Sequence, residues 1–282
     1  MGIRPRSRRG HPYLAGAPIF AAHRGGARLA PENTIEAFRS AVEVWGVDML
    51  ELDVRLSRDG EVMVIHDETV ERTTDGQGRV ADFTRDELGD LDAGARFVDL
   101  EGRASFRGRG VRIPTFGELL EACPRTRLNV EAKCAEVAGP LVDVIRSHGA
   151  EHRVLLAAEF EANRRDARGY RGAWGASRSQ VGPFWLLHRV PLLGRLYTPP
   201  CDVLQVPALW RGRPVADARF VLEAHRRNIP VHVWVVDDPN QMRAWLRAGI
   251  DAIQTDRPDL LARVLHEETG RPLPPGAREG AA

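Results

Sequence analysis

Apolar and polar residues alternate most clearly over residues 49–54, which read Met-Leu-Glu-Leu-Asp-Val. An alternation of period two is typical of a β-strand, and it places Glu51 and Asp53 on one face, on the order of 6.5 Å apart. Two adjacent acids repel each other unless a positive charge lies between them. The pattern favours a strand that presents two carboxylates to a divalent cation. The alternative is a solvated edge strand.

Short apolar runs and helical periodicities alternate along the rest of the chain. Further strands are expected over 18–22, 62–65, 127–133, 154–158, 173–176, 201–206, 230–236 and 251–254. Helices are expected over 33–46, 115–121, 140–148, 161–168, 216–227, 241–248 and 258–265. In the first helix, Asn33 is the expected N-cap and Glu36 the N3 residue of a capping box. About eight strand–helix repeats predict a closed parallel sheet, the (β/α)8 TIM barrel.

The barrel is predicted to span residues 18–266, with other segments at both ends and one inside it. Residues 1–17 are basic and lack periodicity, which predicts a flexible tail. Residues 68–113 are rich in Gly, Asp, Arg and Thr and too long for a simple connection. They are therefore predicted to be an insertion after the second strand, above the site. Residues 267–282 are rich in Pro, Gly and Ala, which predicts a disordered tail.

The composition is that of an ordinary soluble globular protein. Hydrophobic residues make up 43%, charged residues 28%, and the net charge is +1, which favours no nucleic-acid partner. Three widely spaced cysteines fit a reducing compartment. No apolar run has the length of a signal peptide or a membrane span. The sequence therefore predicts a cytoplasmic protein and gives no indication of its oligomeric state.

Lysine usage singles out one position. Of the 40 basic residues only Lys133 is a lysine, so the other 39 are arginines. A compact ammonium is chemically distinct from a guanidinium fork, which indicates a specific need for lysine at this position. Lys133 ends the predicted strand 127–133 and shares a face with Glu131.

Charged residues gather at the ends of the predicted strands, where barrel enzymes keep their active sites. These residues are His23, Arg24, Glu51, Asp53, His66, Glu131 and Lys133. Three carboxylates without a thiolate favour Mg²⁺ or Ca²⁺ as the bound metal. The cations favour a phosphate guest, and two histidines can move protons, so the set predicts metal-assisted cleavage of a phosphate ester. Asp67 is interpreted as an orienting residue, and Glu32 as part of a helix entry.

Several short motifs follow one another in a fixed order along the chain. They are His23-Arg24-Gly25, Pro31-Glu32-Asn33-Thr34, Glu51-Leu52-Asp53-Val54, His66-Asp67, Arg72-Thr73-Thr74, Glu131-Ala132-Lys133, Trp234 and Thr255-Asp256-Arg257-Pro258. This order resembles that of the glycerophosphodiester phosphodiesterase family, and the resemblance covers residues 19–265.

The resemblance implies a (β/α)8 barrel with an inserted segment and a divalent metal, usually Mg²⁺ or Ca²⁺. It implies Glu51, Asp53 and Glu131 as metal ligands, His23 and His66 as acid and base, Arg24 and Lys133 on the phosphate, and Trp234 in the substrate pocket. The family's usual reaction cleaves a glycerophosphodiester to glycerol 3-phosphate and an alcohol. In the family mechanism the neighbouring glycerol hydroxyl attacks phosphorus, and the reaction passes through a cyclic phosphate.

Two departures from the family pattern bear on the alcohol. Ala158-Glu159-Phe160 stands where a Ser-Phe pair is common, and Val235 follows Trp234 where a Thr is common. His-Arg-Gly-Gly at 23–26, followed by the acidic strand, also resembles the branch that releases lysophosphatidic acid from lysophospholipids. A lysophospholipid is therefore the second substrate class. A barrel that binds phosphodiesters without cleaving them is the third hypothesis, which the two histidines disfavour.

Residues 181–200 carry many large apolar residues, three basic residues and no acid. An outer barrel helix packed on the sheet is one interpretation. The other is a lip that contacts a membrane or an acyl chain, because exposed aromatic and leucine side chains beside arginines suit an anionic lipid surface.

Overall fold

The computed structural model describes residues 12–190 and 196–278. Within them, nine strands form one sheet, of which β3 pairs with β2 antiparallel and the other eight run parallel. The parallel strands are β1 (Ile19–Ala22), β2 (Met49–Leu56), β4 (Arg127–Ala132), β5 (Val154–Ala157), β6 (Ala173–Trp174), β7 (Leu204–Pro207), β10 (Val231–Trp234) and β11 (Ala252–Thr255). A parallel bridge between Gly175 and Val203 joins β6 to β7. The predicted (β/α)8 barrel is confirmed.

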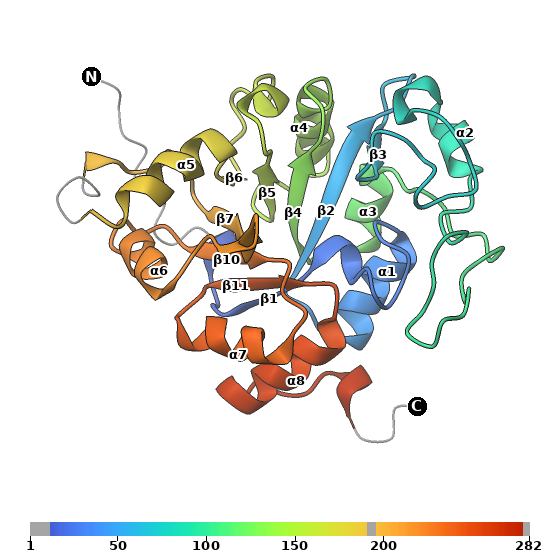
Figure 1. The fold of residues 1–282 in the computed structure, drawn as a ribbon. Helices are drawn as coiled ribbons and strands as arrows, with labels where there is room; N and C mark the ends of the chain where they lie inside the picture. Colours follow the sequence, from blue (N-terminus) through green and yellow to red (C-terminus); the bar gives the residue numbers. More distant parts are fainter. Residues whose placement is uncertain (1–11, 191–195, 279–282) are drawn as a thin grey trace.

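Helices cover the outside of this sheet (Figure 1). They are α1 (Ile35–Arg39) with a following π-helical turn (Ser40–Val44), α3 (Phe116–Ala122), α4 (Ala138–Ser147), α5 (Arg178–Leu187), α6 (Ala218–His225), α7 (Pro239–Arg247) and α8 (Pro258–Thr269). No helix in the described residues is long and apolar enough to cross a membrane. The helix predicted over 161–168 is wrong: only a 3-10 turn, Glu161–Arg164, forms there. Ala162 and Ala167 are its only apolar residues, too little to bury a helical face.

The amino-terminal end of the barrel is closed by residues before β1. The 3-10 turn Pro12–Leu14 places Tyr13, which has no exposed surface, in the cluster inside the barrel. The Tyr13 hydroxyl lies 2.8 Å from the Met49 sulfur, and Arg127 donates hydrogen bonds to the carbonyls of Tyr13 and Ala15. The predicted flexible tail is therefore wrong for residues 12–17, because a barrel interior needs a plug at its base. Residues 1–11 lie outside the described part.

The segment 68–113 follows the short strand β3 (Val62–Val64) and contains the 3-10 turn Val80–Asp82 and helix α2 (Arg85–Gly89). Strands β2 and β3 form an antiparallel hairpin. The segment has a buried cluster of its own, made of Met63, Ile65, Val70, Val80, Leu88, Ala93, Val111 and Ile113. This cluster gives the segment a fixed shape beside the carboxyl ends of the strands.

The carboxyl-terminal segment packs beyond the predicted end of the barrel. Helix α8 continues to Thr269, and Gly270 ends it with φ +73°. Arg271 then donates hydrogen bonds of 2.7 and 2.8 Å to the two carboxylate oxygens of Asp48. The predicted disordered tail is therefore wrong for residues 267–278. Local composition does not reveal the order of this segment, because an ion pair with a distant residue leaves no local pattern.

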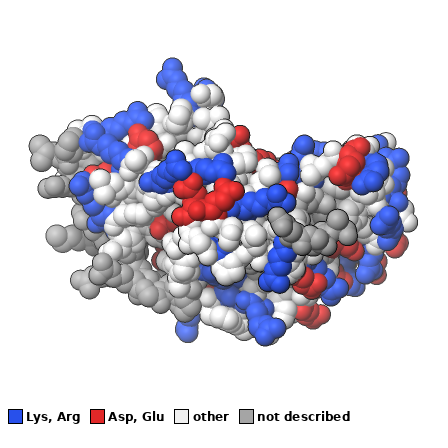
Figure 2. Space-filling model, turned by 90° about the horizontal axis from the view of Figure 1, so that it is seen from below, with Lys and Arg blue, Asp and Glu red and all other residues white. Residues whose placement is uncertain are grey.

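Figure 2 looks onto the face that α7 and α8 form, where blue and red side chains lie next to each other. Arg243 pairs with Glu267 at 2.5 Å, and Arg247 pairs with Glu268 at 2.8 Å. Arginines of α7 thus pair with glutamates of α8 on this face.

Candidate active site

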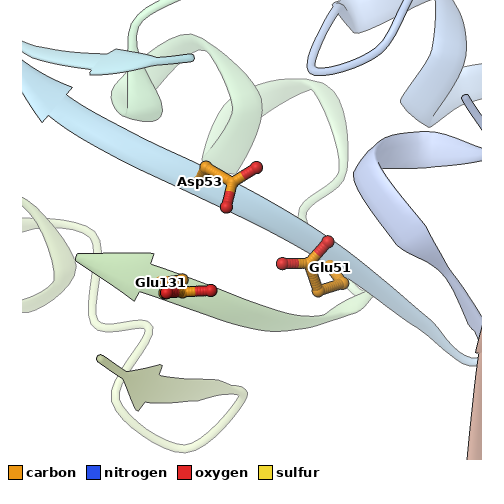
Figure 3. Close-up of side chains that lie close together, drawn as sticks. All are labelled: Glu51, Asp53 and Glu131. Atoms are coloured by element: carbon orange, nitrogen blue, oxygen red, sulfur yellow. The ribbon is translucent and has the colours of Figure 1, made fainter. Parts of the chain in front are cut away.

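Three carboxylates meet at the carboxyl ends of β2 and β4 (Figure 3). Glu51 and Asp53 project from one face of β2, and Glu131 stands on β4 opposite Asp53 in the parallel register. One oxygen from each residue lies within 4.8 Å of the others. The alternation of residues 49–54 predicted the first two positions, and the strand pairing brings the third to them. This separation is within the reach of a single cation.

The surroundings of these acids fit a cation. Glu51 and Asp53 are buried, and burial together with the charge of Asp53 raises the pKa of Glu51 to about 7. His23 and Arg24 lie near Glu51 but do not outweigh burial and the Asp53 charge, so a divalent cation would further stabilise the ionised carboxylates. The Asn33 amide donates to Asp53 Oδ2 at 3.1 Å, and the Arg24 backbone N–H donates to Glu51 Oε2 at 3.1 Å. Both bonds hold the acids in place.

Lys133 lies between two of the carboxylates. Its Nζ is 3.0 Å from Asp53 Oδ1 and 3.0 Å from Glu131 Oε2. Burial opposes its charge, but the two acids outweigh burial and raise the Lys133 pKa above its ordinary value. For Asp53 too, Lys133 and Arg24 outweigh burial and lower its pKa. The chain's single lysine is thus a permanent ammonium in a space shared by two acids.

The motif at 23–26 forms a tight turn after β1. Arg24 has φ +49°, and Gly25 and Gly26 have φ +83° and +92°. A Cβ on Gly25 would lie 2.8 Å from Ala37 Cβ, so a glycine is required where the turn packs on α1. The turn directs His23 and the Arg24 guanidinium toward the acids, with His23 Nε2 3.7 Å from Glu51 Oε2 and Arg24 Nε 3.1 Å from Asp53 Oδ2.

His23 has an aspartate partner that the sequence reasoning did not assign to the site. Its Nδ1 lies 2.6 Å from Asp256 Oδ1, and the Asp256 backbone N–H in turn donates to Asp237. Burial lowers the pKa of His23, but Glu51 and Asp256 outweigh burial and raise it overall. A detectable signal existed, because Asp256 directly follows β11, the strand that pairs with β1.

His66 has a matching partner. Its Nδ1 lies 2.5 Å from Asp67 Oδ1, as the orienting interpretation of Asp67 expects. Burial lowers the pKa of His66 although Asp53 and Asp67 oppose this. Burial alone would raise the pKa of Asp67, but hydrogen bonds from Arg72 and His66 lower it to about 2. Both histidines thus have an aspartate on Nδ1, which leaves Nε2 for the substrate.

Glu32 links the two sides of the site. Arg72 donates to both its oxygens, at 2.7 and 2.8 Å, and Arg24 donates to Oε1 at 2.8 Å. Arg72 also donates to Asp67, the partner of His66. Glu32 lies just before the α1 cap, as interpreted, and also joins these two arginines. The predicted N-cap is wrong, because Thr34 caps α1, while Asn33 has φ +58° and holds Asp53. At Asn33 a tertiary contact outweighs the local capping pattern.

All eight residues predicted for the site line one cavity of about 590 Å³. They are His23, Arg24, Glu51, Asp53, His66, Glu131, Lys133 and Trp234. The side chain of Trp234 is 38% exposed, so it is part of the cavity wall and not of the core. The structure brings the whole predicted set together, while the individual roles remain predictions.

The opposite side of the cavity is apolar and was only partly foreseen. Val181, Trp185 and Leu186 come from α5, and Trp210 comes from a hairpin of β8 (Leu209–Trp210) and β9 (Arg213–Pro214) that the sequence reasoning missed. Helix α5 buries Phe184 under the barrel wall yet leaves Leu186 65% exposed. We call Val181, Trp185, Leu186 and Trp210 the apolar wall. Residues 191–195 of the predicted lip lie outside the described residues.

Comparison with known proteins agrees with this geometry. The profile of the Glycerophosphoryl diester phosphodiesterase family matches residues 23–170 and 186–260. A glycerophosphodiester phosphodiesterase from Caldanaerobacter subterraneus subsp. tengcongensis is 32% identical over 262 residues, which cover 88% of this chain and 98% of the relative. A human lysophospholipase D is 26% identical, with coverage of 86% and 85%.

A solved structure shows the same architecture. An Oleispira antarctica phosphodiesterase in complex with the product sn-glycerol-3-phosphate is similar with a TM-score of 0.73 and 26% identity. The similarity covers 88% of this chain and 97% of that one. The fold, the acid cluster and the matched segments together show that the chain belongs to the glycerophosphoryl diester phosphodiesterase family and is a phosphoric diester hydrolase.

Proposed function

We propose that this protein hydrolyses glycerophosphodiesters to sn-glycerol 3-phosphate and an alcohol, with Mg²⁺ or Ca²⁺ as cofactor. The observation that carries the proposal is the meeting of Glu51, Asp53 and Glu131 beside Lys133 and Arg24. Acids for a metal and cations for a phosphate thus share one buried place. The Oleispira relative, whose structure holds sn-glycerol-3-phosphate, supports the same product.

The metal would be held by the three carboxylates. Oxygen ligands alone favour a hard cation, and either Mg²⁺ or Ca²⁺ satisfies that chemistry. When bound, such a cation supplies Lewis acidity toward a phosphoryl oxygen. Lys133 and Arg24 contact the same acids and would carry the remaining phosphate oxygens.

The histidines would move the protons. Each has its Nδ1 on an aspartate, so that each Nε2 is free to face the phosphate. One imidazole removes the proton of the attacking hydroxyl, and the other returns a proton to the oxygen of the departing alcohol. The attacking group that the family resemblance implies is the neighbouring glycerol hydroxyl, and water then opens the cyclic phosphate.

Amide side chains beneath the acids suit the glycerol. Asn129 and Gln254 are buried at the cavity floor, at 4% and 2% exposure, and Gln205 lines the same floor. Asn129 Oδ1, Gln205 Nε2 and Gln254 Nε2 have no hydrogen-bond partner among the described residues. Buried polar atoms are normally paired, so substrate hydroxyl groups or water would satisfy them.

The proposal is tested with purified protein that is stripped of metal and then given Mg²⁺ or Ca²⁺. Release of sn-glycerol 3-phosphate from glycerophosphocholine, glycerophosphoethanolamine or glycerophosphoglycerol is expected only with metal. If the folded, metal-loaded protein cleaves none of these diesters or their acylated counterparts, the barrel is a phosphodiester-binding protein and the proposal fails.

A lysophospholipid is the second candidate substrate, favoured by the apolar wall opposite the acids. The human relative, a lysophospholipase D, is consistent with it. An acyl chain laid on Val181, Trp185 and Leu186 would leave the phosphodiester at the metal, giving lysophosphatidic acid. A direct comparison of glycerophosphocholine with lysophosphatidylcholine separates the two candidates. Action in the cytoplasm is part of this second proposal.

A further inference from the structure

Apolar side chains stand exposed on or beside α5 and the β8–β9 hairpin, two elements that line the cavity. Leu196 is 70% exposed, Leu209 56%, Trp210 49% and Val190 42%. Val190 follows the end of α5, and Leu196 precedes Tyr197, whose hydroxyl donates a hydrogen bond to the Gln180 carbonyl of α5. The other two residues form strand β8 of the hairpin. We call these four residues the rim. Isolated exposed leucines are ordinary on protein surfaces, but a group of four beside a cavity is a feature that needs a cause.

The two parts of the rim belong to one surface. The Arg178 guanidinium on α5 lies 6.0 Å from the ring of Trp210 on the hairpin, and both residues line the cavity. The residues of α5 and of the hairpin therefore lie on the same side of the cavity opening. A flat partner that meets one part meets the other as well.

Basic residues accompany the rim. Arg211 lies 4.9 Å over the Trp210 ring, Arg189 lies 5.7 Å over Trp185, and Arg178 and Arg213 stand on the two elements themselves. Among the described residues from 178 to 214 these four arginines face a single acid, Asp202, which is buried. Glu159 and Asp217 contact Arg178 and Arg189 from outside this stretch. The positive charge exceeds the negative charge around the rim.

We propose that the rim docks the protein on an anionic lipid bilayer, with the cavity opening facing the membrane. Leucine and tryptophan side chains enter the boundary between headgroups and acyl chains, while arginines contact lipid phosphates. An apolar patch surrounded by cations matches this partner in both chemistry and charge. A second copy of this chain would bring two positive rims together, which disfavours a dimer. The proposal goes beyond the catalysed reaction, since docking needs no turnover.

The test is sedimentation with vesicles of phosphatidylglycerol and phosphatidylcholine, in equal parts, and with phosphatidylcholine vesicles as the neutral reference. The unmodified protein should sediment with the anionic vesicles and much less with the neutral ones. Raising the salt should weaken binding, because the arginine contribution is screened. Activity plays no part in this readout, so failure of docking and failure of the proposed hydrolysis are told apart.

Variants outside the cavity lining make the test specific. Leu196→Ser with Leu209→Ser should lower vesicle affinity at least tenfold, and Arg211→Glu should lower it several-fold on anionic vesicles only. The matched control is Leu100→Ser with Arg109→Glu, two exposed residues of the insertion, which should leave binding unchanged. All variants should keep the circular dichroism spectrum and the rate on glycerophosphocholine, if that diester is a substrate.

Three results would overturn the proposal. The first is no sedimentation with either vesicle. The second is an equal loss of binding in the control variant, which would show nonspecific adsorption of a basic protein. The third is a dimer in light scattering that the double leucine variant dissociates, which would identify a second copy of the chain as the partner of the rim.

Discussion

The two sides of the cavity are built in different ways. The charged side stands on β2 and β4 and on the turns after β1 and β3, where nearly every side chain has a hydrogen-bond or ion-pair partner. Asp53, for example, contacts Lys133 and Asn33. The apolar wall stands on α5 and a two-stranded hairpin, and its side chains are partly exposed. The difference indicates that the sheet holds the reacting groups rigidly, whereas the peripheral elements select the alcohol.

The largest effect is expected on the charged side from loss of the metal site. Glu51→Gln should abolish metal binding in calorimetry and lower the rate to background, because the acid cluster loses one of its three charges. Removal of metal by a chelator should do the same, and Mg²⁺ or Ca²⁺ should restore the rate. Glu121→Gln, at an exposed position, is the control. Full activity of Glu51→Gln would show that the acids do not hold the metal.

The histidines come next. His23→Ala and His66→Ala should each lower kcat by about 10² to 10⁴-fold, the usual contribution of a positioned acid or base. Metal affinity and the circular dichroism spectrum should remain, since neither residue supplies a metal ligand in the proposal. His152→Ala, at an exposed position, should behave as the unmodified protein. An unchanged kcat for either active-site variant would remove that residue from the chemistry.

A smaller effect, limited to the acylated substrate, is expected on the apolar wall. Leu186→Asp places a charge on the wall, so KM for a short-chain, monomeric lysophosphatidylcholine should rise by about tenfold. KM and kcat for glycerophosphocholine should change by less than about twofold. Equal effects on both substrates would show that the wall does not distinguish them, and the contrast between the two sides of the cavity would fail.

The smallest effect concerns stability on the charged side. The pKa of Asp67 is about 2, below its ordinary value of 3.8, so the ionised form stabilises the fold at neutral pH. That contribution is lost as the pH falls from about 5 toward 2, and partial exposure limits it to about 1 kcal/mol. Urea unfolding at several pH values should show a shallower acid loss in Asp67→Asn than in the exposed control Asp143→Asn. If the unfolding free energies of the two variants fell in parallel with pH, the pairing of Asp67 with Arg72 and His66 would be contradicted.

Local patterns predicted the parts of the site that lie on strands. The alternation around Glu51 and Asp53 and the charged end of 127–133 each indicate a face of one strand. Because the carboxyl ends of all parallel strands lie at the same end of a barrel, these residues could be assigned to one site. Asp256 escaped the same reasoning, although it too follows a strand, because its role depends on the pairing of β1 with β11.

The errors share a physical cause. Tyr13 and Arg271 are ordered by partners on distant segments, Met49 for the first and Asp48 for the second. Asn33 gives up the helix cap because a buried carboxylate, Asp53, takes its amide. In each case a tertiary contact outweighs a local preference of a few tenths to one kcal/mol.

By itself, the sequence determined the alternation of strands and helices, the barrel and the identity of the charged residues at the strand ends, because these depend on periodicity and side-chain chemistry. Only the tertiary structure decided that Asp256 orients His23, how Glu32 joins the two arginines, and that α5 and the hairpin form one apolar wall. Such contacts join residues far apart in the chain. Closure of the barrel, and no local rule, sets their distances.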